Sequence, residues 1–156
     1  MNLSAQMAKH FREVFFGENW TSVNLKETLN GVNWQQAVTS VYGFNSIAVL
    51  VYHINYYVSA VLTVFDDGTL EASDKYSFDM TPVTSEEDWK ILQDKVFSDA
   101  EKFACYVEQM PEEKFVQIFV DEKYGTYYRN IHGIIEHTHY HLGQISLIKK
   151  MLLAGA

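Results

Sequence analysis

The sequence feature that most constrains the fold is a long apolar run from Ile47 to Phe65. Its apolar side chains recur at helical spacing along one stripe, at Ile47, Leu50, Val51, Ile54, Val58, Val61 and Phe65. The opposite side is also largely apolar, and a helix of this kind lies inside a protein. A β-strand is the alternative, because Val and Tyr favour strands, but the run is long for one strand. We therefore predict a buried helix that begins after Asn45 or Ser46 and ends near Phe65.

Three other segments have helical patterns of similar length. The first runs from about Leu3 to Phe16, the second follows a predicted capping box at residues 84–87 and ends near Gln109, and the last runs from about residue 126 to Leu153. Shorter helical stretches are predicted at 25–29, after a second capping box at 33–36, and at 112–120. The chain is therefore predicted to be all-α.

Residues 69–82 form a long polar connection between the second and third long helices. In a bundle, a connection of this length is a crossover that leaves the two helices parallel. The length of 156 residues is sufficient for one domain with its own core. We therefore predict a single four-helix-bundle domain over residues 1–156.

Composition excludes several classes of function. The net charge of −8 opposes binding to nucleic acid and to anionic membranes. The apolar run contains His53, Asn55 and three tyrosines, and it is short and polar for a membrane span. The single cysteine, Cys105, rules out an internal disulfide and fits a reducing compartment. With no signal-peptide pattern at the N-terminus, the predicted location is the cytoplasm.

Four of the six histidines lie between His132 and His141. His137 and His141 are one helical turn apart and share a face with Ile134, Ile145 and Ile148, which points the pair inward. His53 lies in the middle of the buried helix. Each of these could be an ordinary core histidine, but three inward imidazoles on two helices favour a metal site with open positions for chemistry.

The remaining histidines and the cysteine are weaker candidates. His10 has charged neighbours and is expected to be solvated. His132 and His139 fall on a different stripe from His137, so surface or interface positions are expected for both. Cys105 could be a nucleophile, but a lone helical cysteine is usually a small buried residue.

Three further residues could contribute near the histidines. Gln144 is about one turn beyond His141 and could form a hydrogen bond within the site, although plain packing is the alternative. Tyr57 is one turn beyond His53 and could line the same cavity. Glu136 points about 100° away from His137, so it is expected to be a solvated carboxylate, with a supporting or acid–base role as the alternative.

Two segments carry a family resemblance. The stretch Ala48-Val-Leu-Val-Tyr-His53-Ile and the stretch Gly133-Ile-Ile-Glu-His137-Thr-His-Tyr-His141-Leu-Gly-Gln144 resemble the DinB/YfiT superfamily. The resemblance implies a four-helix bundle of up-down-down-up connectivity. It also implies a histidine triad of His53, His137 and His141 that binds a divalent ion such as nickel, zinc, iron or manganese. His139 is extra to the motif.

The resemblance further implies a small-molecule substrate, since members include S-transferases that use low-molecular-weight thiols. It also implies a homodimer. Two classes of function follow. The first is a metal-dependent enzyme, most simply a thiol S-transferase or a hydrolase. The second is a non-catalytic metal-binding or stress-associated protein that acts through ligand binding or oligomerisation. A bundle without metal is the third, plainest reading.

Overall fold

The computed structural model describes residues 2–155, so the first and last residues of the predicted domain 1–156 lie outside it. The described chain is all-α, as predicted. Within residues 2–155 the only β-type pairing is an isolated antiparallel bridge between Ile118 and Thr126. Fold class therefore follows directly from the helical periodicity of the sequence.

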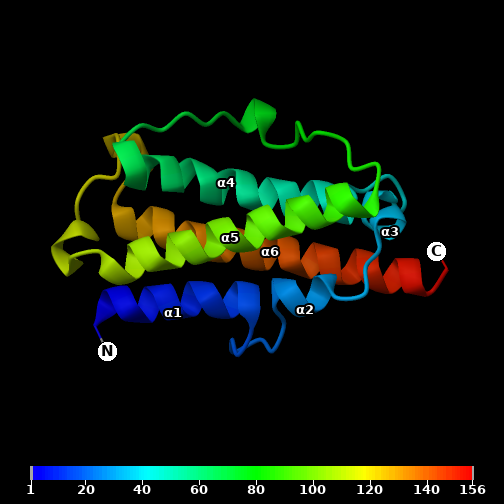
Figure 1. Ribbon diagram of the computed structural model, residues 1–156. Coiled ribbons are helices and arrows are strands. Elements are labelled where there is room, and N and C mark those ends of the chain that lie inside the picture. The colour runs from blue at the N-terminus through cyan, green and yellow to red at the C-terminus, as the bar shows by residue number, and fades with distance from the viewer. Residues whose placement is uncertain (1, 156) are drawn as a thin grey trace.

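Four long helices lie side by side in Figure 1. They are α1 (Leu3–Phe16), α4 (Ile47–Asp67), α5 (Glu86–Gln109) and α6 (Tyr127–Leu153). Helix α1 packs against α5 and α6, and α4 packs against the same two helices. Each long helix therefore buries its apolar stripe against two neighbours.

The shorter elements connect the long helices at their ends. They are α2 (Leu25–Leu29), α3 (Trp34–Val38) and the 3-10 turns η1 (Asp74–Tyr76), η2 (Glu112–Lys114) and η3 (Glu122–Tyr124). The predicted capping box before α3 is confirmed, because Asn33 and Gln36 bond to each other's backbone N–H groups. Lys149 of α6 holds the end of α2 by donating to the carbonyl oxygens of Thr28 and Asn30.

Helix α4 begins and ends at clear signals. The side chain of Ser46 accepts a hydrogen bond from the Val49 N–H, so Ser46 is the N-cap. Gly68 ends the helix in the left-handed conformation, with φ of 82°. By length and mean hydropathy of 1.6 the helix could cross a membrane, but 61% of its most apolar window is buried inside the protein. It is therefore consistent with the core helix of a soluble protein.

Two predicted local features were wrong. The capping box at Thr84 is displaced, because Ser85 is the N-cap and accepts from the Asp88 N–H, while the Asp88 carboxylate accepts from Thr84. The predicted helix over 112–120 is only the single turn η2. The residues after η2 pair instead with the start of α6, whose Tyr127 and Tyr128 N–H groups donate to the carbonyls of Gln117 and Phe115.

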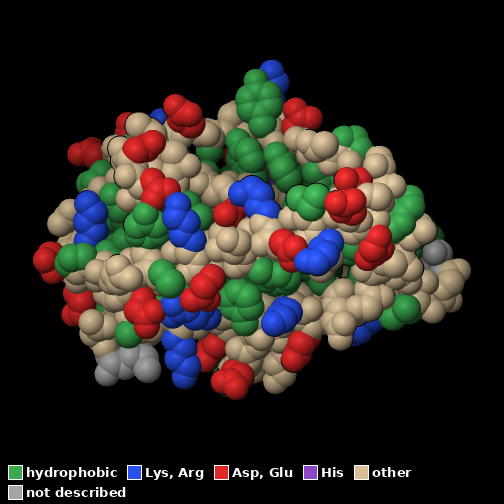
Figure 2. All heavy atoms as spheres, in the orientation of Figure 1, with side chains coloured by type: hydrophobic (Ala, Val, Ile, Leu, Met, Phe, Trp, Pro, Cys, Tyr) green, Lys and Arg blue, Asp and Glu red, His purple; other side chains and the backbone are tan. Residues whose placement is uncertain are grey.

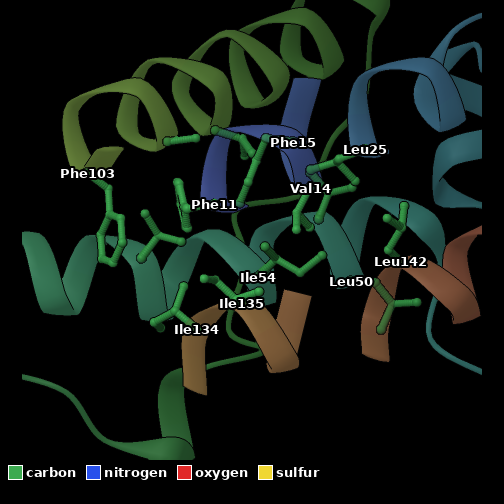
Figure 3. Close-up of a cluster of buried hydrophobic side chains, with 14 of the residues drawn as sticks. Phe11, Val14, Phe15, Leu25, Leu50, Ile54, Phe103, Ile134, Ile135 and Leu142 are labelled. Atoms are coloured by element: carbon green, nitrogen blue, oxygen red, sulfur yellow. The ribbon is translucent and has the colours of Figure 1, made fainter. Parts of the chain in front are cut away.

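The core is formed by side chains from all four long helices and from α2. Figure 3 shows Phe11 and Phe15 of α1 and Phe103 of α5 close together above α4. The Phe11 and Phe103 rings stack with centroids 4.3 Å apart. Trp89 at the start of α5 is fully buried, and its indole N–H donates to the Val32 carbonyl at 2.9 Å. This bond satisfies the one polar atom of the Trp89 side chain, so burial of this ring leaves no polar atom of the side chain unpaired.

A crossover, residues 68–85, connects the end of α4 to the start of α5. Figure 1 shows it running back along α4 on the side away from α1, with η1 near its middle. Basic and acidic side chains are intermixed on the face drawn in Figure 2. The crossover thus places residues of an irregular segment over the middle of α4, where His53 lies.

Candidate metal centre

His53 is held in the middle of α4 by two residues of the crossover. The ring is buried, and its Nδ1 lies 3.1 Å from the Ser77 carbonyl oxygen. Because a carbonyl only accepts, Nδ1 carries the proton and donates it. Phe78 stacks on the imidazole with ring centroids 3.9 Å apart and planes 6° apart. His53 is therefore fixed with Nε2 unprotonated and pointing away from the crossover.

His141 is held in a similar way on α6. It is buried, and its Nδ1 lies 2.7 Å from Oε1 of Gln144, an amide oxygen that only accepts. Nδ1 therefore donates and Nε2 is left with its lone pair. The hydrogen-bonding alternative for Gln144 is confirmed, since its side chain sets the tautomer of His141, as supporting residues of metal-binding histidines do.

The three imidazoles converge through their Nε2 atoms. Nε2 of His137 lies 3.1 Å from Nε2 of His53 and 3.1 Å from Nε2 of His141. Nitrogen ligands at the usual ~2.0–2.1 Å from one ion lie about 2.9–3.4 Å apart in octahedral or tetrahedral geometry. The observed separations match this range. In the candidate set, one ligand atom from each of the three residues lies within 4.8 Å of the other two.

The protonation states also suit a cation. Burial, followed by the nearby rings of His141 and His53, lowers the pKa of His137 to about 4. Burial also lowers the pKa of His53 and His141, although the bonds to Ser77 and Gln144 act in the opposite direction. Neutral imidazole is the form that binds metal. Without an ion, Nε2 of His137 carries at most one proton. Only one of its two neighbours, Nε2 of His53 or Nε2 of His141, can then accept a hydrogen bond from it.

His137 connects this cluster to a cavity of about 530 Å³ between α4, α6 and the crossover. His137 is half-buried and lines the cavity, whereas His53 and His141 do not. Tyr57 lines it as well, in agreement with the sequence analysis, and its hydroxyl donates to Asp74 at 2.7 Å. An ion held by the three rings would therefore be approached from the side of His137.

The other sequence candidates lie outside the cluster. His10 is exposed on α1, with its ring centroid 6.3 Å from that of the half-buried His139. His132 stacks on Tyr128 at the surface, as expected. Glu136 is exposed at the edge of the cavity, 3.6 Å from His132 Nδ1. Glu136 is therefore a solvated carboxylate, as the sequence predicts.

Cys105 is half-buried on α5, facing α1. Its sulfur is 3.5 Å from Arg12 and 3.7 Å from Glu101. Reactive cysteines often lie beside an arginine, but Arg12 is already paired with Glu101 and Glu108. We therefore assign Cys105 no role in the candidate site.

Sequence reasoning missed the residues that complete the site. Ser77, Phe78 and Asp74 belong to the irregular crossover, where no periodicity predicts which residue meets α4. Arg129 and Asn130 of α6 also line the cavity of His137. Spacing gives only a weak signal for Arg129, since it lies two helical turns before His137 but about 80° away around the helix.

Comparisons with known proteins add no identification. No family model matches the chain, and neither a curated protein nor a solved structure does. The geometry of the three histidines and their cavity is therefore the main indication of function.

Proposed function

We propose that this chain is a divalent-metal-dependent enzyme of the DinB/YfiT type, with His53, His137 and His141 as the metal ligands. The observation that carries the proposal is the convergence of three imidazoles, with Nε2 of His137 3.1 Å from Nε2 of both His53 and His141 and all three ligand atoms within 4.8 Å of one another. The four long helices and the crossover are interpreted as an up-down-down-up four-helix bundle. Nickel, zinc and iron suit imidazole ligands, whereas manganese, the fourth candidate, prefers oxygen ligands.

Each residue near the cluster has a distinct task in this proposal. Ser77 and Gln144 fix the tautomers of His53 and His141, and Phe78 fixes the plane of His53. The ion would serve as a Lewis acid that activates a thiol or a water molecule as nucleophile. Tyr57, whose ring centroid lies 4.9 Å from that of His137 and whose hydroxyl is bonded to Asp74, is a hydroxyl in the cavity that could donate a proton to a leaving group.

The reaction proposed is transfer of a low-molecular-weight thiol to an electrophile, or hydrolysis. The substrate is a small molecule, because the cavity of about 530 Å³ has the size of a small-ligand pocket. We place the protein in the cytoplasm. We also propose a homodimer, with the exposed apolar side chains Tyr140 and Leu147, which share a face of α6, as part of the contact surface.

Two measurements test the proposal in sequence. Elemental analysis of protein purified without a histidine tag, followed by titration with first-row metal ions, tests the site itself. One ion per chain is the expected result, and no uptake of any ion would refute the proposal. Turnover in a panel of thiols and electrophiles, with and without the ion, then separates an enzyme from a metal-binding protein that has no catalysis.

A further inference from the structure

We infer that the substrate of the proposed site carries a carboxylate group, and that Arg129 binds this group. The inference rests on the proposed function and adds the chemical class of the substrate. Arg129 lines the same cavity as His137. Both residues come from α6, eight positions apart, which corresponds to about 12 Å along a helix. The carboxylate would therefore lie at the opposite end of the cavity from the reacting atom.

The stripe of α6 between these two residues is open. Gly133 occupies the position halfway between Arg129 and His137 and also lines the cavity. A Cβ atom built on Gly133 meets no atom within 4 Å, so the space beside it is empty. Any larger residue at this position would project into that space. The cavity is thus continuous from Arg129 to His137, and one molecule could contact both.

The guanidinium of Arg129 is already oriented. Its Nη1 donates to the Tyr124 carbonyl oxygen at 2.8 Å. Its side chain also passes close over Gly125, where a Cβ atom would lie only 2.9 Å from Arg129 Cδ. Gly125 has φ of 74°, which glycine adopts without strain. The turn before α6 therefore positions the arginine side chain and leaves its other N–H donors available.

Arg129 is exposed, and its charge has no ion-pair partner among residues 2–155. Among residues 2–155, Arg12 is the only other arginine, and it forms ion pairs with Glu101 and Glu108. No ion pair joins Arg129 to any described residue, although the chain has a net charge of −8. An oriented guanidinium with free donors matches the planar, two-oxygen geometry of a carboxylate.

The acidic residues of the cavity favour a carboxylate over a phosphate. Asp74 and Glu136 also line it, and neither forms an ion pair with Arg129. Asp74 accepts from Tyr57, and Glu136 lies nearest His132. Both carboxylates repel an anionic ligand, and they repel a doubly charged phosphate more strongly than a singly charged carboxylate. A monoanion with one carboxylate is therefore the class of ligand that fits.

The test compares two probes of nearly equal shape on metal-free protein. The first is 2-naphthoate, and the second is its neutral analogue 2-naphthamide, each titrated by calorimetry. Naphthoate is expected to bind at least ten-fold more tightly than naphthamide. In R129Q this preference should disappear through loss of naphthoate affinity alone, and in R129K it should be reduced, since lysine lacks the planar fork.

The control is K90Q, which makes the same change in net charge. Lys90 is an exposed residue of α5 and lies away from the cavity. It should leave the affinity for both probes unchanged. Equal binding of the two probes to the unmodified protein, or a preference that survives in R129Q, would overturn the inference. So would stronger displacement of naphthoate by inorganic phosphate than by acetate at matched ionic strength.

Zinc titration of R129Q separates this inference from the proposed function. Arg129 is two turns from the nearest histidine of the cluster, so zinc affinity should not change. A chain that takes up no metal but keeps the Arg129-dependent preference would refute the proposed function and leave a carboxylate site. A chain that binds zinc but shows no preference between the probes would refute the carboxylate inference alone.

Discussion

Helix α4 buries polar side chains on two sides, and the two groups satisfy their hydrogen bonds differently. Toward α5, the Asn55 amide and the Ser59 hydroxyl both donate to the Asp99 carboxylate, at 2.8 and 2.9 Å, and Lys95 donates to the same oxygen at 2.6 Å. Toward α6, the rings of His53 and His141 each turn the lone pair of Nε2 toward Nε2 of His137. The first group contains donors for its charge, whereas the second has an excess of acceptors.

The difference separates a structural network from a binding site. Burial alone would raise the pKa of Asp99, but the donors Lys95, Asn55 and Ser59 hold it below its usual value, so the charge is compensated within the protein. The three neutral histidines have no charged partner among the described residues, and the buried Nδ1 of His137 has no hydrogen-bond partner there either. A buried polar group without partners is costly. We therefore expect substitutions toward α5 to affect stability and substitutions toward α6 to affect metal affinity.

The largest effect is expected for H141A. Removing one of three ligands should lower zinc affinity by about 1000-fold, or roughly 4 kcal/mol of binding free energy. Competition against a chromogenic chelator measures this change. The matched control is H10A, an exposed histidine on α1, which should keep full affinity. Equal losses in the two variants would contradict the assignment of His141 as a ligand.

Substitution of the network toward α5 should have the opposite profile. In D99A, Asn55 and Ser59 lose their shared acceptor, and the free energy of unfolding should fall by about 2 kcal/mol. Urea unfolding of metal-free protein followed by circular dichroism measures this. Zinc affinity should remain within about three-fold of the original value. A large loss of zinc affinity in D99A would show that the two sides of α4 are not independent.

Acid should destabilise the metal-free protein through the histidine side. The pKa of His137 is about 4 in the folded protein, below the usual value of 6.5, so the unfolded chain binds more protons between these pH values. Stability is then complete above pH 6.5 and decreases as the pH falls toward 4. The loss should be on the order of 1–2 kcal/mol, since the ring is only partly buried and solvent screens it. H137Q should flatten this part of the curve, and an unchanged slope would count against a lowered pKa of His137 in the folded protein.

The smallest effect is expected at the residue that orients a ligand. Q144A removes the acceptor of the His141 Nδ1 proton and should lower zinc affinity about ten-fold, at the lower end for such supporting residues. Q144E keeps an acceptor at the same place and should restore most of the affinity. If Q144E binds zinc as weakly as Q144A, the hydrogen bond to His141 does not set the tautomer.

Sequence patterns were sufficient for those features that depend on helical periodicity. The inward side of α6 and the central position of His53 both follow from residue spacing, and the structure brings the three predicted histidines together. Contacts made by irregular chain could not be predicted, because Ser77 and Phe78 have no periodic neighbours. The capping box at Thr84 failed for a local reason, since Ser85 competes for the same role and Asp88 serves both residues.

The hydrogen bond between His53 and Ser77 makes the crossover part of the metal site. The ion needs His53 in its present orientation, which the crossover holds. By thermodynamic linkage, the free energy by which the ordered crossover improves ion binding equals the free energy by which the ion stabilises residues 68–85. Proteolytic cleavage or an insertion near η1 should therefore release the ion, although no ligand is altered. Metal occupancy would then report on the integrity of a loop that supplies none of the three coordinating nitrogens.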